Sequence, residues 1–226
     1  MIFIDNKFRA PRHWSNECLR KISPHITGRV LNASGWRDED KQGDKYKNYF
    51  IHCSDYVISN YEDSEQGGLQ GDIGNEIFLD LTQELPIEMH GAFDCVFSHT
   101  VLEHVFEVQT AFRNLSKLSS DLVVTVVPFL QEEHTDYGDY WRFTPQALRK
   151  LLNKNGFEMI YLNYNDVARQ SIYVIAVGAK FPTRWSGISQ IEDNKVTKYD
   201  HKIGTRVIKN SVLSQFIKKL VNKLWI

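Results

Sequence analysis

Cysteine is scarce in this sequence, and long apolar runs are missing. The three cysteines among 226 residues, Cys18, Cys53 and Cys95, form no CxxC pair. Neither a disulfide framework nor a cysteine-based zinc site is therefore expected, and a reducing, cytoplasmic compartment is the default. The N-terminus lacks the basic region and apolar stretch of a signal peptide. No run reaches about 18 apolar residues, so no membrane span is expected.

Several catalytic signatures are missing as well. No G-x-G-x-x-G occurs, which argues against a nicotinamide site, and no HExxH or similar spacing occurs. His134, Asp136 and Asp139 could form a His/carboxylate metal site, and Cys95, His99 and His104 could be imagined as ligands. However, Cys95 lies in the middle of an expected strand, and no recognisable ligand spacing occurs. No functional metal is therefore expected. The sequence also has no internal repeat and no low-complexity tract.

Charge is distributed unevenly along the chain. Hydrophobic residues make up 42% and charged residues 24%, which is typical of a globular protein, and the length suits one large domain with an appendage. The net charge of −1 combines +6 in residues 201–226, which contain no acid, with −7 in the other 200 residues. An acidic body argues against nucleic-acid binding and directs attention to what the basic tail contacts.

Apolar runs bounded by turn residues alternate with segments of helical period, which predicts an α/β sheet. The expected strands are 29–33, 55–59, 76–80, 93–97, 121–127, 157–163 and 171–180. The fifth run, DLVVTVV, is nearly all apolar or β-branched, as suits a central parallel strand buried on both faces.

Two helices are expected within the domain. Residues 101–118 place apolar side chains at helical spacing between the fourth and fifth strands and predict a crossover helix. Thr144 and Pro145 predict the start of a second helix, because threonine caps and proline suits the first position. Asn155 and Gly156 predict its end.

Polar residues gather where the expected parallel strands end. Open α/β sheets bind ligands in the crevice outside the carboxyl ends of their strands, so these positions are the candidate site. They are Asn32 to Trp36, Asn60 to Glu62, Asp80 and Leu81, Ser98 to Thr100, Glu103 and His104, and His134 to Arg142.

Three stretches carry a family resemblance: FDCVFSHTVLEHV at 93–105, VVTVVPF at 123–129 and DYWRFTPQALRKLLNKNGFE at 139–158. On these motifs the chain resembles a class I S-adenosylmethionine (SAM)-dependent methyltransferase, of the type 11 branch common in bacterial polysaccharide gene clusters. The resemblance covers roughly residues 14–180. It implies a Rossmann-like, mostly parallel sheet of seven strands with helices on both faces, and SAM as cofactor.

The segment after the first expected strand departs from the family's D-x-G-x-G cofactor motif. Asn32 replaces the acid, Ser34 replaces one glycine, and Trp36 stands in place of the other, although glycine is used there so that backbone can approach the cofactor. The resemblance assigns these positions to the adenosyl site. The full set it implies is Asn32, Ala33, Ser34, Gly35, Trp36, Asn60 (with Glu62 nearby), Asp80, Leu81 and His99.

Methyl transfer to oxygen requires alignment of the reactants and removal of a proton near neutral pH, which favours histidine or a carboxylate as base. His104 and His134 are the histidines expected over the crevice, and Asp139 could orient either. Aromatic side chains suit a sugar face or adenine. The expected acceptor residues are Tyr137, Tyr140, Trp141 and Arg142, of which Arg142 could instead be an ion-pair partner that fixes the loop.

The domain is expected to span 1–180, followed by a linker at 181–205 and an amphipathic helix at 206–226. The sequence VIKNSVLSQFIKKLVNKLWI places a broad apolar face beside lysines. Three interpretations remain open: a helix on a membrane surface, a helix docked on a protein partner or a second copy, or a helix packed on its own domain. Peripheral attachment to the inner face of the membrane would follow from the first.

The leading prediction is an enzyme, a SAM-dependent methyltransferase that methylates an oxygen of a carbohydrate or a cell-surface glycan intermediate. The expected acceptor is a small molecule or a glycan. The altered cofactor loop motivates an alternative. In that alternative the chain is a non-catalytic, methyltransferase-like module for binding or assembly in surface-polysaccharide biosynthesis.

Overall fold

The computed structural model describes residues 5–61, 68–71, 74–134, 138–197, 202–206 and 217. Its elements in chain order are α1(Arg9–Ile22), η1(Ser23–His25), β1(Gly28–Ala33), η2(Tyr46–Tyr49), β2(Cys53–Asn60), β3(Glu76–Phe78), η3(Ile87–Met89), β4(Phe93–His99), η4(Leu102–His104), α2(Val108–Leu118), β5(Ser119–Leu130), α3(Pro145–Lys154), β6(Glu158–Tyr164), β7(Ile172–Ala179), η5(Pro182–Trp185) and α4(Ser186–Ser189), where η marks a 3-10 helix.

One seven-stranded sheet forms the centre of the molecule, in the order β3-β2-β1-β4-β5-β7-β6. The first five strands run parallel to their neighbours, and β7 pairs antiparallel with both β5 and β6. The predicted mostly parallel sheet is confirmed, and each expected strand is present with bounds shifted by a few residues. Strand β5 is buried over nearly its whole length, as its apolar run predicted.

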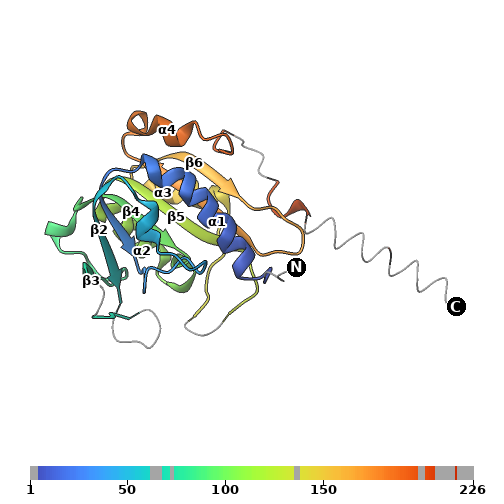
Figure 1. Ribbon diagram of the computed structural model, residues 1–226, viewed down its shortest axis with the longest axis horizontal. Helices are drawn as coiled ribbons and strands as arrows, with labels where there is room; N and C mark the ends of the chain where they lie inside the picture. Colours follow the sequence, from blue (N-terminus) through green and yellow to red (C-terminus); the bar gives the residue numbers. More distant parts are fainter. Residues whose placement is uncertain are drawn as a thin grey trace.

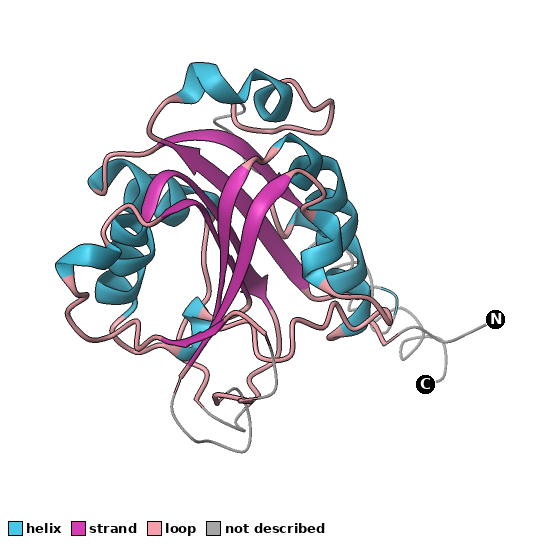
Figure 2. Cartoon of the chain, turned by 60° about the vertical axis from the view of Figure 1, so that its left-hand side comes forward, coloured by secondary structure: helices cyan, strands magenta, loops and turns pink. Residues whose placement is uncertain are grey.

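Helices cover both faces of the sheet, as predicted (Figures 1 and 2). Helix α1 packs Leu19 and Ile22 against one face, in a core cluster with Phe97. Helices α2 and α3 pack on the other face, where Phe112 and Leu148 belong to a second cluster. Because both faces are apolar, the carboxyl edge of the strands is left for polar chemistry.

The predicted helix over 101–118 is interrupted, which corrects that expectation. Its first turn is η4, and α2 begins only at Val108. The backbone carbonyl of Glu103 accepts from the amides of Tyr140 and Trp141, and the Trp141 indole donates to the carbonyls of Val105 and Phe106. In a continuous helix these carbonyls would accept hydrogen bonds from the next turn. Here they accept from Tyr140 and Trp141 and so hold the 138–142 segment in place. The helix predicted from Thr144 is confirmed, since the Thr144 hydroxyl accepts from the Ala147 amide.

Strand β1 connects to β2 through a loop, residues 34–52, whose only helical element is the 3-10 turn η2. The loop bends sharply, because Trp36 and Asp38 both have positive φ although neither is glycine. The Asp38 carboxylate is 1% exposed. It accepts hydrogen bonds from the Asn32 amide, the Tyr56 hydroxyl and the Lys47 backbone amide. One buried carboxylate therefore fixes the loop against β1 and β2.

The segment predicted as a linker, 181–205, packs on the domain where the structure describes it. Trp185 and Ile188 are buried, and the Trp185 indole donates to Asp121 at the start of β5. Most of the predicted helix at 206–226 lies outside the described residues. Within the described ranges, no helix has the length and apolar character needed to cross a membrane.

Replacing Asp38 with alanine should lower the free energy of unfolding by about 2–4 kcal/mol, because three buried donors lose their acceptor. Urea denaturation measures the change. Glu39→Ala, which alters the exposed neighbouring residue, is the matched control and should change stability little. Equal stability of Asp38→Ala and the native chain would contradict the role given to this carboxylate.

Candidate functional site

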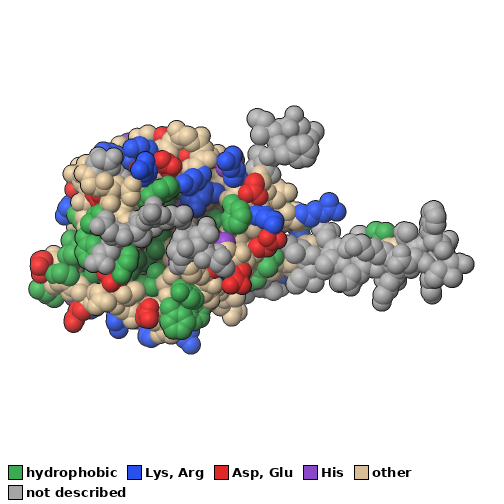
Figure 3. All heavy atoms as spheres, turned by 90° about the horizontal axis from the view of Figure 1, so that it is seen from below, with side chains coloured by type: hydrophobic (Ala, Val, Ile, Leu, Met, Phe, Trp, Pro, Cys, Tyr) green, Lys and Arg blue, Asp and Glu red, His purple; other side chains and the backbone are tan. Residues whose placement is uncertain are grey.

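The candidate site lies at the carboxyl edge of the parallel strands. The chain leaves β1 toward β2 on one side, while β4 lies on the other side, which makes the edge between β1 and β4 the topological switch point where such sheets bind ligands. Figure 3 looks onto this edge: apolar side chains line a hollow near the middle, and basic, acidic and histidine side chains gather beside it.

The backbone of the predicted cofactor loop is fastened to the end of β2. The amide of Ser34 donates to the Ser59 hydroxyl, and the amide of Gly35 donates to the Ser59 carbonyl. The amide of Trp36 donates to the side-chain oxygen of Asn60, whose amide group donates back to the Trp36 carbonyl. All three loop donors and the Asn60 side chain are therefore engaged within the protein.

Gly35 is required by close packing inside this loop. A Cβ atom there would lie 2.5 Å from the side-chain nitrogen of Asn32, and that nitrogen donates to Asp38. The Asn32 side chain thus packs against Gly35 and links the loop to Asp38. The Trp36 ring is partly exposed, with the Lys41 ammonium 4.5 Å from its centre. The Trp36 side chain is thus accessible in part, whereas the amides of Ser34, Gly35 and Trp36 are already bonded.

The other predicted cofactor residues divide into core and crevice positions. The side chains of Ala33 and Leu81 belong to the core. Asp80 is partly exposed, and one of its carboxylate oxygens accepts from the amide and hydroxyl of Thr82. The second carboxylate oxygen of Asp80 makes no hydrogen bond to another of the described residues.

His99 is the last residue of β4, and its ring contacts Arg12 and Ser15 of helix α1. The Ser15 hydroxyl donates to the Arg12 carbonyl and therefore accepts from Nε2 of His99, 2.9 Å away. Nδ1 of His99 is then the acceptor that faces Thr100 and Arg12. Burial lowers the pKa of His99 well below its usual range, and the nearby Arg12 charge lowers it further. The ring is therefore neutral and fixed in one tautomer.

His134, Asp139 and Arg142 form a connected triplet at the end of β5. Nδ1 of His134 lies 3.0 Å from an oxygen of Asp139 without a hydrogen bond between them, and the His134 backbone amide donates to the same carboxylate. The Arg142 guanidinium binds both Asp139 oxygens, at 2.5 and 2.6 Å. Those bonds lower the pKa of the Asp139 carboxyl to about 2. Asp139 thus contacts His134, and Arg142 holds Asp139 rather than projecting toward an acceptor.

His104 and Glu103 lie beside this triplet. The His104 and His134 rings meet edge to face with centres 4.9 Å apart. Nδ1 of His104 donates to the Gly138 carbonyl at 2.5 Å, and burial lowers the pKa of His104. The Glu103 side chain is 1% exposed with one oxygen lacking a hydrogen bond, and burial raises its pKa to about 8. Glu103 is a functional candidate whose side-chain state the sequence could not reveal.

Three exposed aromatic side chains, Phe106, Tyr140 and Trp141, lie next to one another beside the candidate site. They are called the aromatic shelf. Phe106 and Tyr140 are 63% and 53% exposed and meet edge to face at 5.4 Å. The two indole hydrogen bonds fix Trp141 next to Phe106. Tyr137, also predicted as an acceptor residue, lies outside the described residues. Phe106 was missed, although an aromatic residue directly after the FDCVFSHTVLEHV stretch was a signal that could have found it.

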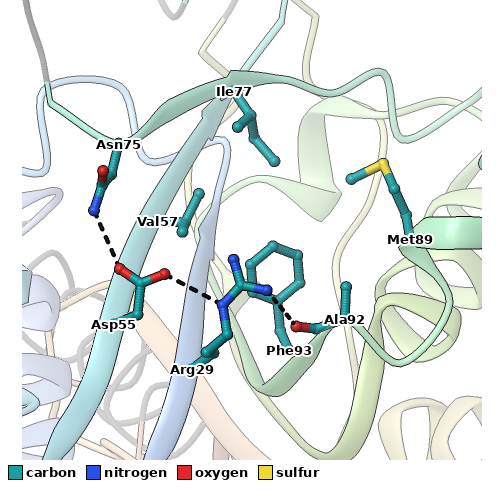
Figure 4. A pocket seen from close by; sticks show the side chains of 8 residues that line it. All are labelled: Arg29, Asp55, Val57, Asn75, Ile77, Met89, Ala92 and Phe93. Atoms are coloured by element: carbon teal, nitrogen blue, oxygen red, sulfur yellow. Dashed lines mark hydrogen bonds and ion pairs between the residues drawn. The ribbon is translucent and has the colours of Figure 1, made fainter.

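A separate cavity of about 340 Å³ contains none of the predicted site residues. Figure 4 shows its apolar side chains together with Asp55, which pairs with both Arg29 and Asn75. Its lining residues are Arg29, Asp55, Val57, Asn75, Ile77, Met89, Ala92 and Phe93. It lies against the sheet face next to η3, and its charged groups are already satisfied by one another.

No group of three or more His, Cys, Asp or Glu side chains is arranged to hold a metal ion among the described residues. Cys95, His99 and His104 do not converge, since Cys95 is buried in mid-strand and the ring nitrogens of His99 are engaged by Ser15, Thr100 and Arg12. Asp136 lies outside the described residues.

The sequence matches no protein-family model and no curated relative. Solved structures do resemble the fold. A chain from a complex of the Haloferax volcanii Trm112 methyltransferase activator with a candidate methyltransferase is 12% identical, with a TM-score of 0.54, covering 75% of this chain and 90% of that one. Magnesium protoporphyrin IX methyltransferase from Synechocystis PCC 6803, with bound SAM, is 15% identical with a TM-score of 0.52, covering 79% and 84%.

A third similar structure is the N-terminal domain of EvdMO1, determined in the presence of SAH and D-fucose. It is 15% identical with a TM-score of 0.51, covering 76% of this chain and 84% of that one. Together with the strand order, these likenesses show that the chain has the Rossmann-like fold of class I methyltransferases.

The Asp139–Arg142 ion pair should make the free energy of unfolding depend on pH. Its folded pKa of about 2 lies below the ~3.9 of an unfolded aspartate, so its contribution is present above about pH 4 and is lost as the pH falls toward 2. The difference corresponds to about 2–3 kcal/mol. The stability gap between the native chain and Asp139→Asn should therefore close between pH 6 and pH 2 in urea denaturation.

The control for this series is Glu132→Gln, which removes a carboxylate from an exposed ion pair with Lys7. Its unfolding curves should follow those of the native chain at every pH. A gap for Asp139→Asn that stays constant with pH would show that the carboxylate does not titrate as the geometry requires.

Proposed function

We propose that the chain is a SAM-dependent methyltransferase that methylates an oxygen of a carbohydrate or a related cell-surface intermediate. The observation that carries the proposal is the His134–Asp139–Arg142 triplet, which lies beside the crevice of a class I methyltransferase fold. A histidine held at its backbone amide by a fixed carboxylate, with a ring nitrogen 3.0 Å from that carboxylate, is suited to removing a proton from a hydroxyl.

The cofactor would be held by side chains rather than by the loop amides. The partly exposed Trp36 ring offers a flat apolar surface for an adenosyl group, and the second oxygen of Asp80 can accept from an exocyclic amine. Ser34, Asn60 and Asn32 hold the loop that carries Trp36 through the bonds described above, and Thr82 holds Asp80. When bound, SAM supplies a methyl group already activated on sulfur, which leaves alignment and proton removal to the protein.

His134 is the proposed general base and Asp139 its positioning residue. Because Asp139 faces Nδ1 of His134, the opposite nitrogen, Nε2, is left as the base for the acceptor hydroxyl. The Asp139 carboxylate would stabilise the imidazolium that forms, and Arg142 would keep that carboxylate in place. His104 serves as a neutral neighbour, because Gly138 fixes its Nδ1 proton and burial disfavours its charged form.

The acceptor is proposed to be a sugar that lies on the shelf of Phe106, Tyr140 and Trp141. Exposed rings in fixed positions suit the apolar face of a pyranose, and nearby polar groups suit its hydroxyls. The fold likeness to a domain studied with SAH and D-fucose supports this acceptor class. A role in bacterial polysaccharide biosynthesis is proposed on the resemblance of the sequence motifs.

Protein or membrane association is proposed only for the basic segment 206–226, most of which lies outside the described residues. Its charge and apolar face suit a membrane surface, a protein partner or a second copy. One similar fold occurs in a complex with a methyltransferase activator, which supports the partner interpretation. A cytoplasmic location, peripheral to the inner membrane face, is proposed with it.

The second candidate function is a non-catalytic binding or assembly module. The specific observation in its favour is the fastened cofactor loop, whose donors at Ser34, Gly35 and Trp36 are all used internally. A loop of that kind offers fewer hydrogen bonds to an adenosyl ligand than the usual glycine-rich motif.

Calorimetric titration with SAM and with its demethylated product SAH separates the two candidates. Micromolar binding is expected, and Asp80→Ala should weaken it by about 1–3 kcal/mol because a partner of a buried polar group is lost. Thr82→Ala removes only the neighbour that binds the other Asp80 oxygen, and it serves as the control. No binding at millimolar concentration would favour the non-catalytic module.

His134→Ala should lower kcat on the true acceptor by about 10²–10⁴-fold, the usual value of a general base, while SAH affinity stays unchanged. Asp139→Asn should lower kcat in the same direction through loss of orientation. His90→Ala, an exposed histidine before β4 at the opposite edge of the sheet, should retain full activity. Full activity of His134→Ala would show that another group removes the proton of the acceptor hydroxyl.

A further inference from the structure

Arg12 reaches from α1 to the end of β4, next to the crevice. Its guanidinium is half-buried and donates to the Thr100 hydroxyl at 2.9 Å and to the Tyr46 hydroxyl at 3.3 Å. It also lies 3.5 Å from Nδ1 of His99. All three groups are neutral, because His99 is held in its uncharged form.

No carboxylate forms an ion pair with Arg12 within the ranges that the structure describes. By contrast, Arg20 on the same helix pairs with Asp40, and Arg142 pairs with Asp139. Withdrawing a guanidinium from water without a counter-charge is unfavourable. A structural arginine in this place would be expected to have an acidic partner, as the other two have.

Glu103 does not supply the missing charge. It lies near enough for its carboxyl to feel the Arg12 charge, yet burial outweighs that attraction and raises the pKa of Glu103 to about 8. Near neutral pH the carboxyl is therefore mostly protonated, and one of its oxygens is buried without a hydrogen bond. In that state Glu103 is a donor, which suits an approaching anion instead of repelling it.

We propose that Arg12 and Thr100 form an anion subsite that takes the carboxylate or phosphate group of the bound ligand. A carboxylate or phosphate there would supply the counter-charge through charge-assisted hydrogen bonds, which a planar guanidinium can donate in pairs. The group could come from the amino-acid end of the cofactor or from an anionic sugar acceptor. The choice between these two sources rests on the proposed function, whereas the existence of the anion subsite does not.

The subsite is tested first with simple anions. In wild-type protein with ¹³C-labelled histidine, titration with acetate or inorganic phosphate at constant ionic strength should shift the His99 ring signal saturably, since Nδ1 faces Arg12. Arg12→Met should abolish the shift, and Arg12→Lys should retain it more weakly. Arg9→Met, which removes an exposed charge one turn earlier on α1, should leave it intact. A wild-type signal that does not saturate, or one that Arg12→Met leaves unchanged, overturns the proposal.

A second titration identifies the source of the anion. SAH carries a carboxylate and 5′-methylthioadenosine does not. If the cofactor occupies the subsite, Arg12→Met weakens SAH binding by about 10- to 100-fold and leaves methylthioadenosine binding unchanged. If the acceptor occupies it, both affinities stay the same and the KM for the acceptor rises. Failure of wild-type protein to bind either adenosyl compound rejects methyl transfer, and the simple-anion titration still decides the subsite.

Discussion

The buried carboxylate of Asp38 is the constraint on which the crevice edge depends. It gathers donors from β1, β2 and the intervening loop, namely Asn32, Tyr56 and Lys47. With the loop so fixed, η2 places the Tyr46 ring against His99 and its hydroxyl within reach of Arg12. The loop held by Asp38 thus packs Tyr46, Tyr49 and Phe50 into the core cluster on this face of the sheet.

Two carboxyl groups at the same edge have opposite protonation states because their partners differ. Asp139 is paired with Arg142 by two short hydrogen bonds, so its charged form is favoured despite burial. Glu103 has no such partner among the described residues, and burial keeps it mostly protonated near neutral pH. Pairs of titratable groups pushed apart in this way are typical of acid–base sites. At this edge, Asp139 therefore carries a fixed negative charge, and the protonated Glu103 carboxyl is a buried hydrogen-bond donor.

The sequence predicted the features that local patterns encode and missed those that need distant partners. Apolar runs predicted the strands, and Thr144 with Pro145 predicted α3 because capping is local. Helix α1 was missed because its buried face mixes Ser15 and Asn16 with apolar residues, and Ser15 finds its partner 84 residues away. For the same reason the sequence placed His134, His104 and Asp139 near the crevice but could not say which histidine Asp139 contacts.

Residues that follow β7 cover one outer edge of the sheet. Strand β6 is the last strand, and unpaired edge strands are prone to wrong pairing. Here Lys195 donates its backbone amide to the Leu162 carbonyl, and the Asn194 side chain accepts from the Leu162 amide. Residues 181–197 therefore complete the sheet, with Trp185 buried against Asp121. Because this segment belongs to the domain, any independent role of the basic tail can begin only after it.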